Sequence, residues 1–65
     1  MKVTYDPDVD VLNIILSNVP VEDSDESRPG LILDYDKRGN VVGIEVLDAS
    51  RRMEDPLSVE YAIER

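Results

Sequence analysis

Turn-forming residues recur along this chain and divide it into short segments. The clearest turn signals are Asp6-Pro7-Asp8, Arg28-Pro29-Gly30 and Asp36-Lys37-Arg38-Gly39. Turn signals at spacings of roughly 8 to 12 residues are typical of an all-β domain. We therefore expect a mainly β fold of the β-rich α+β type, an antiparallel meander of five or six short strands with one short helical turn.

The middle of the chain predicts a β-hairpin. Apolar residues alternate with other residues along 31–35 and again along 41–47, which gives each segment one apolar face. Between them, 36–39 fits a type I turn that Gly39 closes in the left-handed conformation. This connection predicts that the two segments are paired strands.

Four further segments add to the prediction. The segment 2–5 alternates and begins a hairpin, whereas the polar segment 21–27 fits only an exposed edge strand or a loop. Asp48 is expected to cap a single helical turn over 49–53, which is too short to stand without packing on the sheet. The last segment, 57–64, alternates with period two, and this pattern predicts a final strand.

The segment 11–16 is apolar on both faces except at Asn13, which is typical of a strand covered on two sides. So short a chain has few elements to cover the second face, and it has no cysteine for a disulfide or a thiolate zinc site. We therefore expect a homo-oligomer, a two-fold dimer with Val11, Asn13 and Ile15 as the dimer face. The alternative is that the C-terminal strand, over 57–63, covers this face within one chain.

The charge of the chain limits its partners. Fifteen acidic residues against seven basic ones give a formal charge of −8, which has the wrong sign for a phosphate backbone, so nucleic acid is not an expected partner. Four of the acids form a cluster that is expected to bind a basic partner protein: Glu22, Asp23, Asp25 and Glu26. The alternative role of this cluster is to solubilise an edge and block edge-to-edge aggregation.

The composition is that of a small folded protein. With 42% hydrophobic and 34% charged residues, the chain is too apolar for the disordered class. It has no run near the ~20 apolar residues of a membrane span, and its beginning has no signal-peptide core. We expect one domain over 1–65, located in the cytoplasm, with no membrane partner.

Two stretches of the chain together form a specific pattern. The first places alternating apolar residues after a turn, with Tyr5, Asp6, Pro7, Asp10, Leu12, Ile14 and Leu16. The second covers 30–50, with Gly-Leu-Ile-Leu-Asp-Tyr-Asp, a Gly-Ile-Glu triplet and an Asp-Ala-Ser ending. This pattern, over roughly 1–52, resembles the family called domain of unknown function 2283. It departs from the family at Asn13, where members often carry an aromatic residue, and after Met53.

The resemblance implies a small prokaryotic protein with no established activity, so no catalytic residue can be carried over from it.

The residues themselves suggest little metal chemistry. The segment 34–45 has acids at positions 1, 3 and 12 and a glycine at position 6 of a calcium-binding loop, but Arg38 stands where a ligand oxygen is needed. Asp6, Asp8 and Asp10 are typical of a turn. We expect no metal and no cofactor.

An enzyme is the less favoured class, because the chain has neither histidine nor cysteine for the common catalytic groups. The leading hypothesis is a non-enzymatic protein-interaction module with an acidic face. The alternative is a small enzyme or ligand-binding protein whose site forms between subunits. The candidate residues of such an intersubunit cavity are Asp34, Tyr35, Glu45 and Asp48.

Overall fold

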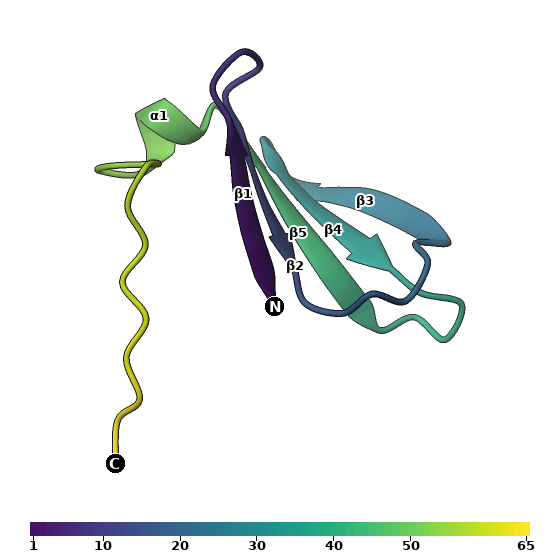
Figure 1. Cartoon of the computed structure of the whole chain (residues 1–65). Coiled ribbons are helices and arrows are strands. Elements are labelled where there is room, and N and C mark those ends of the chain that lie inside the picture. The colour runs from purple at the N-terminus through teal and green to yellow at the C-terminus, as the bar shows by residue number, and fades with distance from the viewer.

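Five antiparallel strands form one sheet in the computed structural model, which describes residues 1–65 (Figure 1). The strands are β1 (Lys2–Asp6), β2 (Val11–Ile15), β3 (Asp23–Arg28), β4 (Leu31–Tyr35) and β5 (Val41–Leu47), and helix α1 (Ala49–Arg52) follows β5. The order across the sheet is β1-β2-β5-β4-β3. The predicted mainly β fold with one short helical turn is confirmed.

The chain leaves simple strand succession at one place. After β2, the segment 16–22 passes along the end of the sheet and enters β3 at the far edge (Figure 1). All six residues of β3 are exposed, whereas β5, with its alternating apolar residues, lies between β2 and β4. A polar strand costs the sheet the least stability at an edge, because only the inner strands need apolar side chains on a covered face.

The hairpin of β4 and β5 has the predicted turn. Gly39 has a φ of +80°, and its amide donates a hydrogen bond of 3.1 Å to the carbonyl oxygen of Asp36. The Asp36 carboxylate accepts the amides of Arg38 and Asn40, both at 2.9 Å. These bonds, first of all the one from the Asn40 amide, hold the pKa of Asp36 below its usual range. The left-handed glycine and the aspartate therefore define this turn.

The predicted cap of α1 is wrong. Asp48 precedes the helix in a left-handed conformation, with φ of 53°, and its side chain makes no capping hydrogen bond. Asp10, from the turn between β1 and β2, supplies the cap instead: its carboxylate accepts the Ser50 amide at 2.9 Å and the Ser50 hydroxyl at 2.6 Å. A capping side chain usually reaches the first helical amides from a residue with an extended backbone, which the left-handed Asp48 does not have, and an acid from another element supplies the bond.

The helical turn packs on the end of the sheet that carries the turns after β1 and β3. Ala49 is fully buried, and the Arg52 guanidinium donates a hydrogen bond of 2.5 Å to the carbonyl oxygen of Pro29. Tyr5 adds a hydroxyl bond of 2.7 Å to Asp10. These bonds join α1 to both edges of the sheet.

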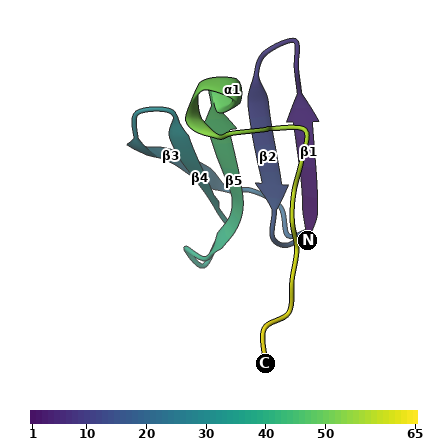
Figure 2. The ribbon, with the colours of Figure 1, turned by 90° about the vertical axis from the view of Figure 1, so that its left-hand side faces the viewer.

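Alternation gives the sheet two different faces. The apolar face carries two rows of paired residues, Val3-Ile14-Ile44-Leu33 and Tyr5-Leu12-Val46-Leu31, together with Val42. The polar face carries Thr4-Asn13-Glu45-Ile32-Glu26 and Lys2-Ile15-Gly43-Asp34-Ser24. Figure 1 and Figure 2 show α1 and the C-terminal segment on the same side of the sheet. That face is the apolar one, since Val3 lies opposite Val59 and Tyr61.

The predicted strand over 57–64 does not form. The chain is extended there but makes no ladder with another strand, and its apolar side chains are exposed. A strand needs a neighbouring strand to satisfy its backbone groups, and the C-terminal segment stands away from β1 in Figure 1. The buried hydrophobic residues are therefore few: Leu12, Val42 and Ala49.

Candidate functional site

A buried carboxylate lies on the polar face of the sheet. Asp34, on β4, is only 9% exposed and pairs in register with Ser24 of β3 and Gly43 of β5. The Ser24 hydroxyl donates a hydrogen bond of 2.6 Å to Asp34 Oδ1. A Cβ built on Gly43 would lie 2.9 Å from Asp34 Oδ2. The glycine therefore makes the room that this carboxylate occupies.

Glu45 lies near Asp34 on the same face. It pairs in register with Asn13 of β2 and with Ile32 of β4. A hydrogen bond with Asp34, then burial, then the negative charge of Asp34 raise the pKa of Glu45 above its usual range. A protonated carboxyl can donate one hydrogen bond and accept others, whereas an ionised carboxylate only accepts. Chemically, Asp34 and Glu45 form a pair that can bind a polar group or transfer a proton.

The structure brings together two of the four residues predicted to form an intersubunit cavity. Asp34 and Glu45 share the polar face, whereas alternation along β4 places Tyr35 on the opposite face. Asp48 follows the end of β5 in a left-handed turn. None of the three surface hollows of the molecule is lined by any of the four residues.

The predicted acidic cluster lies along the free edge of the sheet. Asp23, Asp25 and Glu26 belong to β3, and Glu22 directly precedes it; we call these four residues the acidic edge. One side of β3 pairs with β4, and the other side has no strand beside it (Figure 1). Alternation sends Asp23 and Asp25 to the side of the apolar face and Glu26 to the side of the polar face. The negative charge therefore surrounds this edge.

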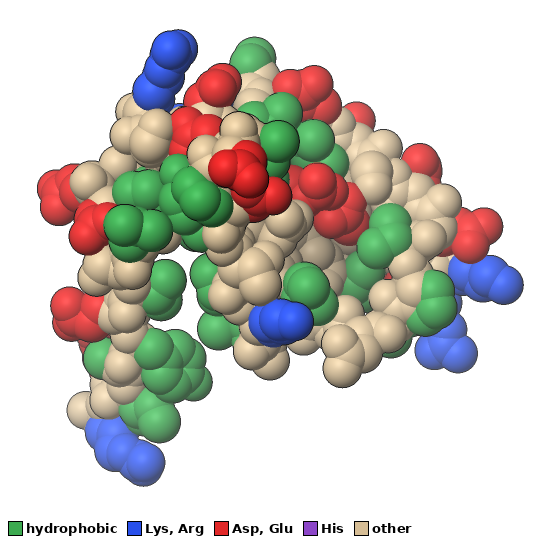
Figure 3. All heavy atoms as spheres, turned by 45° about the horizontal axis from the view of Figure 1, so that its top comes forward, with side chains coloured by type: hydrophobic (Ala, Val, Ile, Leu, Met, Phe, Trp, Pro, Cys, Tyr) green, Lys and Arg blue, Asp and Glu red, His purple; other side chains and the backbone are tan.

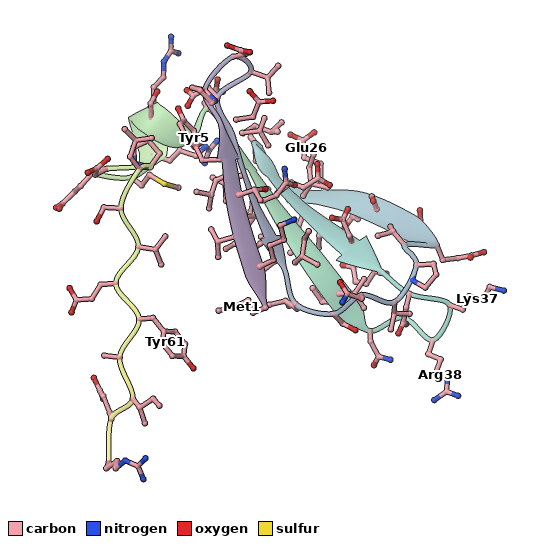
Figure 4. The ribbon with its side chains drawn as sticks, in the orientation of Figure 1. Met1, Tyr5, Glu26, Lys37, Arg38 and Tyr61 are labelled. Carbon is pink, nitrogen blue, oxygen red and sulfur yellow. The ribbon has the colours of Figure 1, made fainter.

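Some of these carboxylates also support the local structure. Glu26 accepts the amide of Gly30 at 2.8 Å, and Asp23 accepts the amide of Ser24 at 2.9 Å. Figure 4 shows Glu26 beside the end of β3, with Lys37 and Arg38 projecting from the far tip of the β4–β5 hairpin. Glu22 and Asp25 have no such amide partner, which leaves their carboxylates available to a ligand.

A shallow hollow beside the acidic edge was not predicted from the sequence. Its volume is about 280 Å³, and it is lined by Val19, Pro20, Glu22, Asp36, Lys37 and Arg38. The hollow forms because the segment 16–22 passes beside the hairpin tip. Both signs of charge border it, so it offers no single-charge site. The only signal in the sequence is the turn at 36–39, whose neighbours depend on the path of a distant segment.

The acids considered for metal binding serve the turns. Asp6 accepts the amide of Asp8 at 2.9 Å, and Asp10 binds Ser50 and Tyr5. No group of three or more acidic side chains is arranged to hold a metal ion. The segment 34–45 contains the predicted turn and the strand residues on either side of it.

The residues predicted as the dimer face lie on the polar face. Val11 and Asn13 are half-buried there beside Leu47 and Glu45, and Ile15 is 36% exposed. Ile15 borders a shallow hollow of about 240 Å³ near the N-terminus. Their contact with a second copy stays a prediction.

Comparison with known proteins gives a family and no activity. No helix of the structure has the length and apolar character needed to cross a membrane. No curated protein and no solved structure matches the chain. A family model described as "Protein of unknown function (DUF2283)" matches residues 2–50, from β1 into α1. With the resemblance thus confirmed over most of its length, the chain belongs to the DUF2283 family of proteins of unknown function.

Proposed function

We propose that this protein is a non-enzymatic interaction module whose acidic edge binds a basic segment of a partner protein. The observation that carries the proposal is β3 itself. All six of its residues are exposed, one of its sides is unpaired, and three of its side chains are acidic. An edge strand offers free amides and carbonyls to an extended peptide, and the side chains around it select the peptide by charge.

The same charges explain why two copies of this strand would not pair with each other. Like charges on facing strands repel, and charged edges are a common protection against edge-to-edge aggregation. A basic strand would remove this repulsion and replace it with attraction. The acidic edge therefore fits a role in which a basic strand binds beside β3, whereas β3 of a second copy does not.

A pull-down from cell extract tests the proposal with a matched control. The test variant changes the acidic edge to Glu22→Gln, Asp23→Ser, Asp25→Ser and Glu26→Gln. The control removes the same number of charges from exposed acids elsewhere, with Asp8→Ser, Glu54→Gln, Glu60→Gln and Glu64→Gln. We expect the test variant to lose basic partners that the wild type and the control retain. Equal recovery by all three proteins would refute the role of the acidic edge.

Salt dependence gives a second test of the same proposal. Association through the acidic edge weakens as the Debye length falls from about 30 Å at low ionic strength to about 8 Å at physiological ionic strength. The dissociation constant of a recovered partner is measured at both ionic strengths for the wild type and the control variant. An affinity that does not change with salt would contradict recognition by charge.

A second candidate function is supported by the Asp34 and Glu45 pair. A raised carboxyl pKa beside a second carboxylate is common at binding and catalytic sites, and the two residues lie on the same face of the sheet. The discriminating variants are Asp34→Asn and Glu45→Gln. Loss of ligand or partner binding in these two variants, with binding intact in the acidic-edge variant, would favour this second candidate.

A further inference from the structure

We propose that the apolar face of the sheet is the contact surface between two copies of this chain, and that the C-terminal segment, residues 57–63, of each copy packs against the other copy. This proposal is independent of the acidic edge. It also places the contact on the face opposite to Val11, Asn13 and Ile15.

The apolar face lacks a second layer. Its two rows run across β1, β2, β5 and β4 without a charged residue, and most of their side chains are only half-buried. Folded domains bury such a face against another sheet or a helix. In this chain α1 covers only the end of the sheet (Figure 2). The rest of the face requires a layer that the single chain does not supply.

The C-terminal segment presents an apolar side of its own. Its alternate residues Leu57, Val59, Tyr61 and Ile63 are 80%, 63%, 76% and 68% exposed. Figure 4 shows Tyr61 pointing from the segment toward the sheet, and Figure 3 shows apolar side chains on both sides of the space between them. A hollow of about 400 Å³ lies there, lined only by Met1, Val3, Val59 and Tyr61. Protein interiors are close-packed, so an apolar hollow of this volume indicates a missing occupant.

The solvent-exposed area of the single chain is larger than that of a compact monomer and fits one subunit of a dimer. A compact monomer of 7.3 kDa exposes ~4,200 Å² by the usual scaling with mass, whereas this chain exposes 5298 Å². The excess is ~1,100 Å², and two copies that buried it together would lose ~2,200 Å². Permanent homodimers bury from about 2,000 Å² upwards. The radius of gyration of 12.6 Å also exceeds the ~10.7 Å expected for this length.

The lack of charge on the apolar face fits a second copy as its occupant. Each chain carries a formal charge of −8, which opposes self-association, so two copies can pack together only over a surface that carries no charge. The apolar face meets this condition, because the acids of β3 lie at its rim and those of the polar face lie behind it. A basic partner would find no counter-charge in the rows of this face. A two-fold pair would match an apolar surface with the same apolar surface.

The four isoleucines of the sheet allow a direct test with an internal control. Ile14 and Ile44 lie on the apolar face, whereas Ile15 and Ile32 lie on the polar face. Copies with labelled isoleucine methyl groups are mixed with unlabelled copies, and isotope-filtered nuclear Overhauser effects are recorded from the methyls to Tyr61 and to the other apolar-face side chains. Among these four residues, we expect intermolecular effects at Ile14 and Ile44 only. Effects at Ile15 or Ile32 instead would overturn the proposal in favour of the polar face.

Mass and variants complete the test. Light scattering of the wild type is expected to give twice 7.3 kDa, and a folded species of 7.3 kDa at all concentrations would refute the dimer. Val59→Ser with Tyr61→Ser is expected to raise the dimer dissociation constant at least ~10-fold, because the dimer then buries less apolar area. Both side chains are exposed within their own chain, so the fold of the single chain should not change. Ser58→Ala with Ala62→Ser, on the other side of the segment, is the control. An unchanged dissociation constant in the Val59 and Tyr61 variant would refute the role of the C-terminal segment.

Discussion

The hydroxyl of Ser24 donates a hydrogen bond of 2.6 Å to the buried carboxylate of Asp34 and so joins the polar edge strand β3 to the interior strand β4. Register places the two residues opposite each other. The bond matters because a buried carboxylate without a donor is costly.

We expect Ser24→Ala to lower the free energy of unfolding by about 1 to 3 kcal/mol, because it leaves the buried Asp34 oxygen without its donor. The measurement is urea unfolding at neutral pH. Ser27→Ala, on the same exposed strand, is the matched control. Equal effects of the two substitutions would show that the Ser24 bond does not stabilise the fold.

The raised pKa of Glu45 predicts a dependence of stability on pH that is opposite in sign to that of most acids. Its pKa is raised in the folded state, so the folded protein binds the proton more tightly than the unfolded chain. Stability is therefore lost as the pH rises from the ordinary glutamate pKa of about 4.3 through the raised value. We expect Glu45→Gln to remove this loss, so that the variant gains in unfolding midpoint over the wild type as the pH rises. A difference that stays constant with pH would contradict the raised pKa of Glu45.

Asp10 predicts the reverse dependence. Hydrogen bonds from the Ser50 hydroxyl, from Tyr5 and from the Ser50 amide lower its pKa in the folded state. This contribution is present above the ordinary aspartate pKa and is lost as the pH falls through the lowered value. We expect Asp10→Asn, which tolerates the same left-handed backbone, to lower the melting temperature and speed amide exchange at Ser50. Asp8→Asn is the control, and equal exchange in both variants would contradict the capping role.

Gly39 offers a test of backbone conformation alone. Its φ is +80°, and a Cβ built there meets no atom within 4 Å, so a substitution strains the backbone without a clash. We expect Gly39→Val to cost more than ~1 kcal/mol in thermal or urea unfolding. Gly39→Asn should cost less, because asparagine enters the left-handed region more readily. If valine and asparagine cost the same, the left-handed turn is not what makes glycine necessary.

The sequence was sufficient where a structural feature is local. The hairpin of β4 and β5 follows from alternation on both sides of 36–39, and the turn residues are neighbours in the chain. The exposed edge character of β3 follows from its own composition. In these cases the residues that make the contacts are close enough in sequence for their spacing to fix their geometry.

The tertiary structure decided the features that join distant segments. Asp10 caps a helix 40 residues away, a role that local spacing assigns to Asp48. The pairing of β2 with β5 sets the rows of both faces, and only these rows reveal which face remains uncovered. Alternation also predicted a strand over 57–64, but a strand exists only where a second strand satisfies its backbone groups. The alternation in the sequence shows which residues of one strand share a face. Only the register between strands that are distant in the sequence shows which residues lie beside that face.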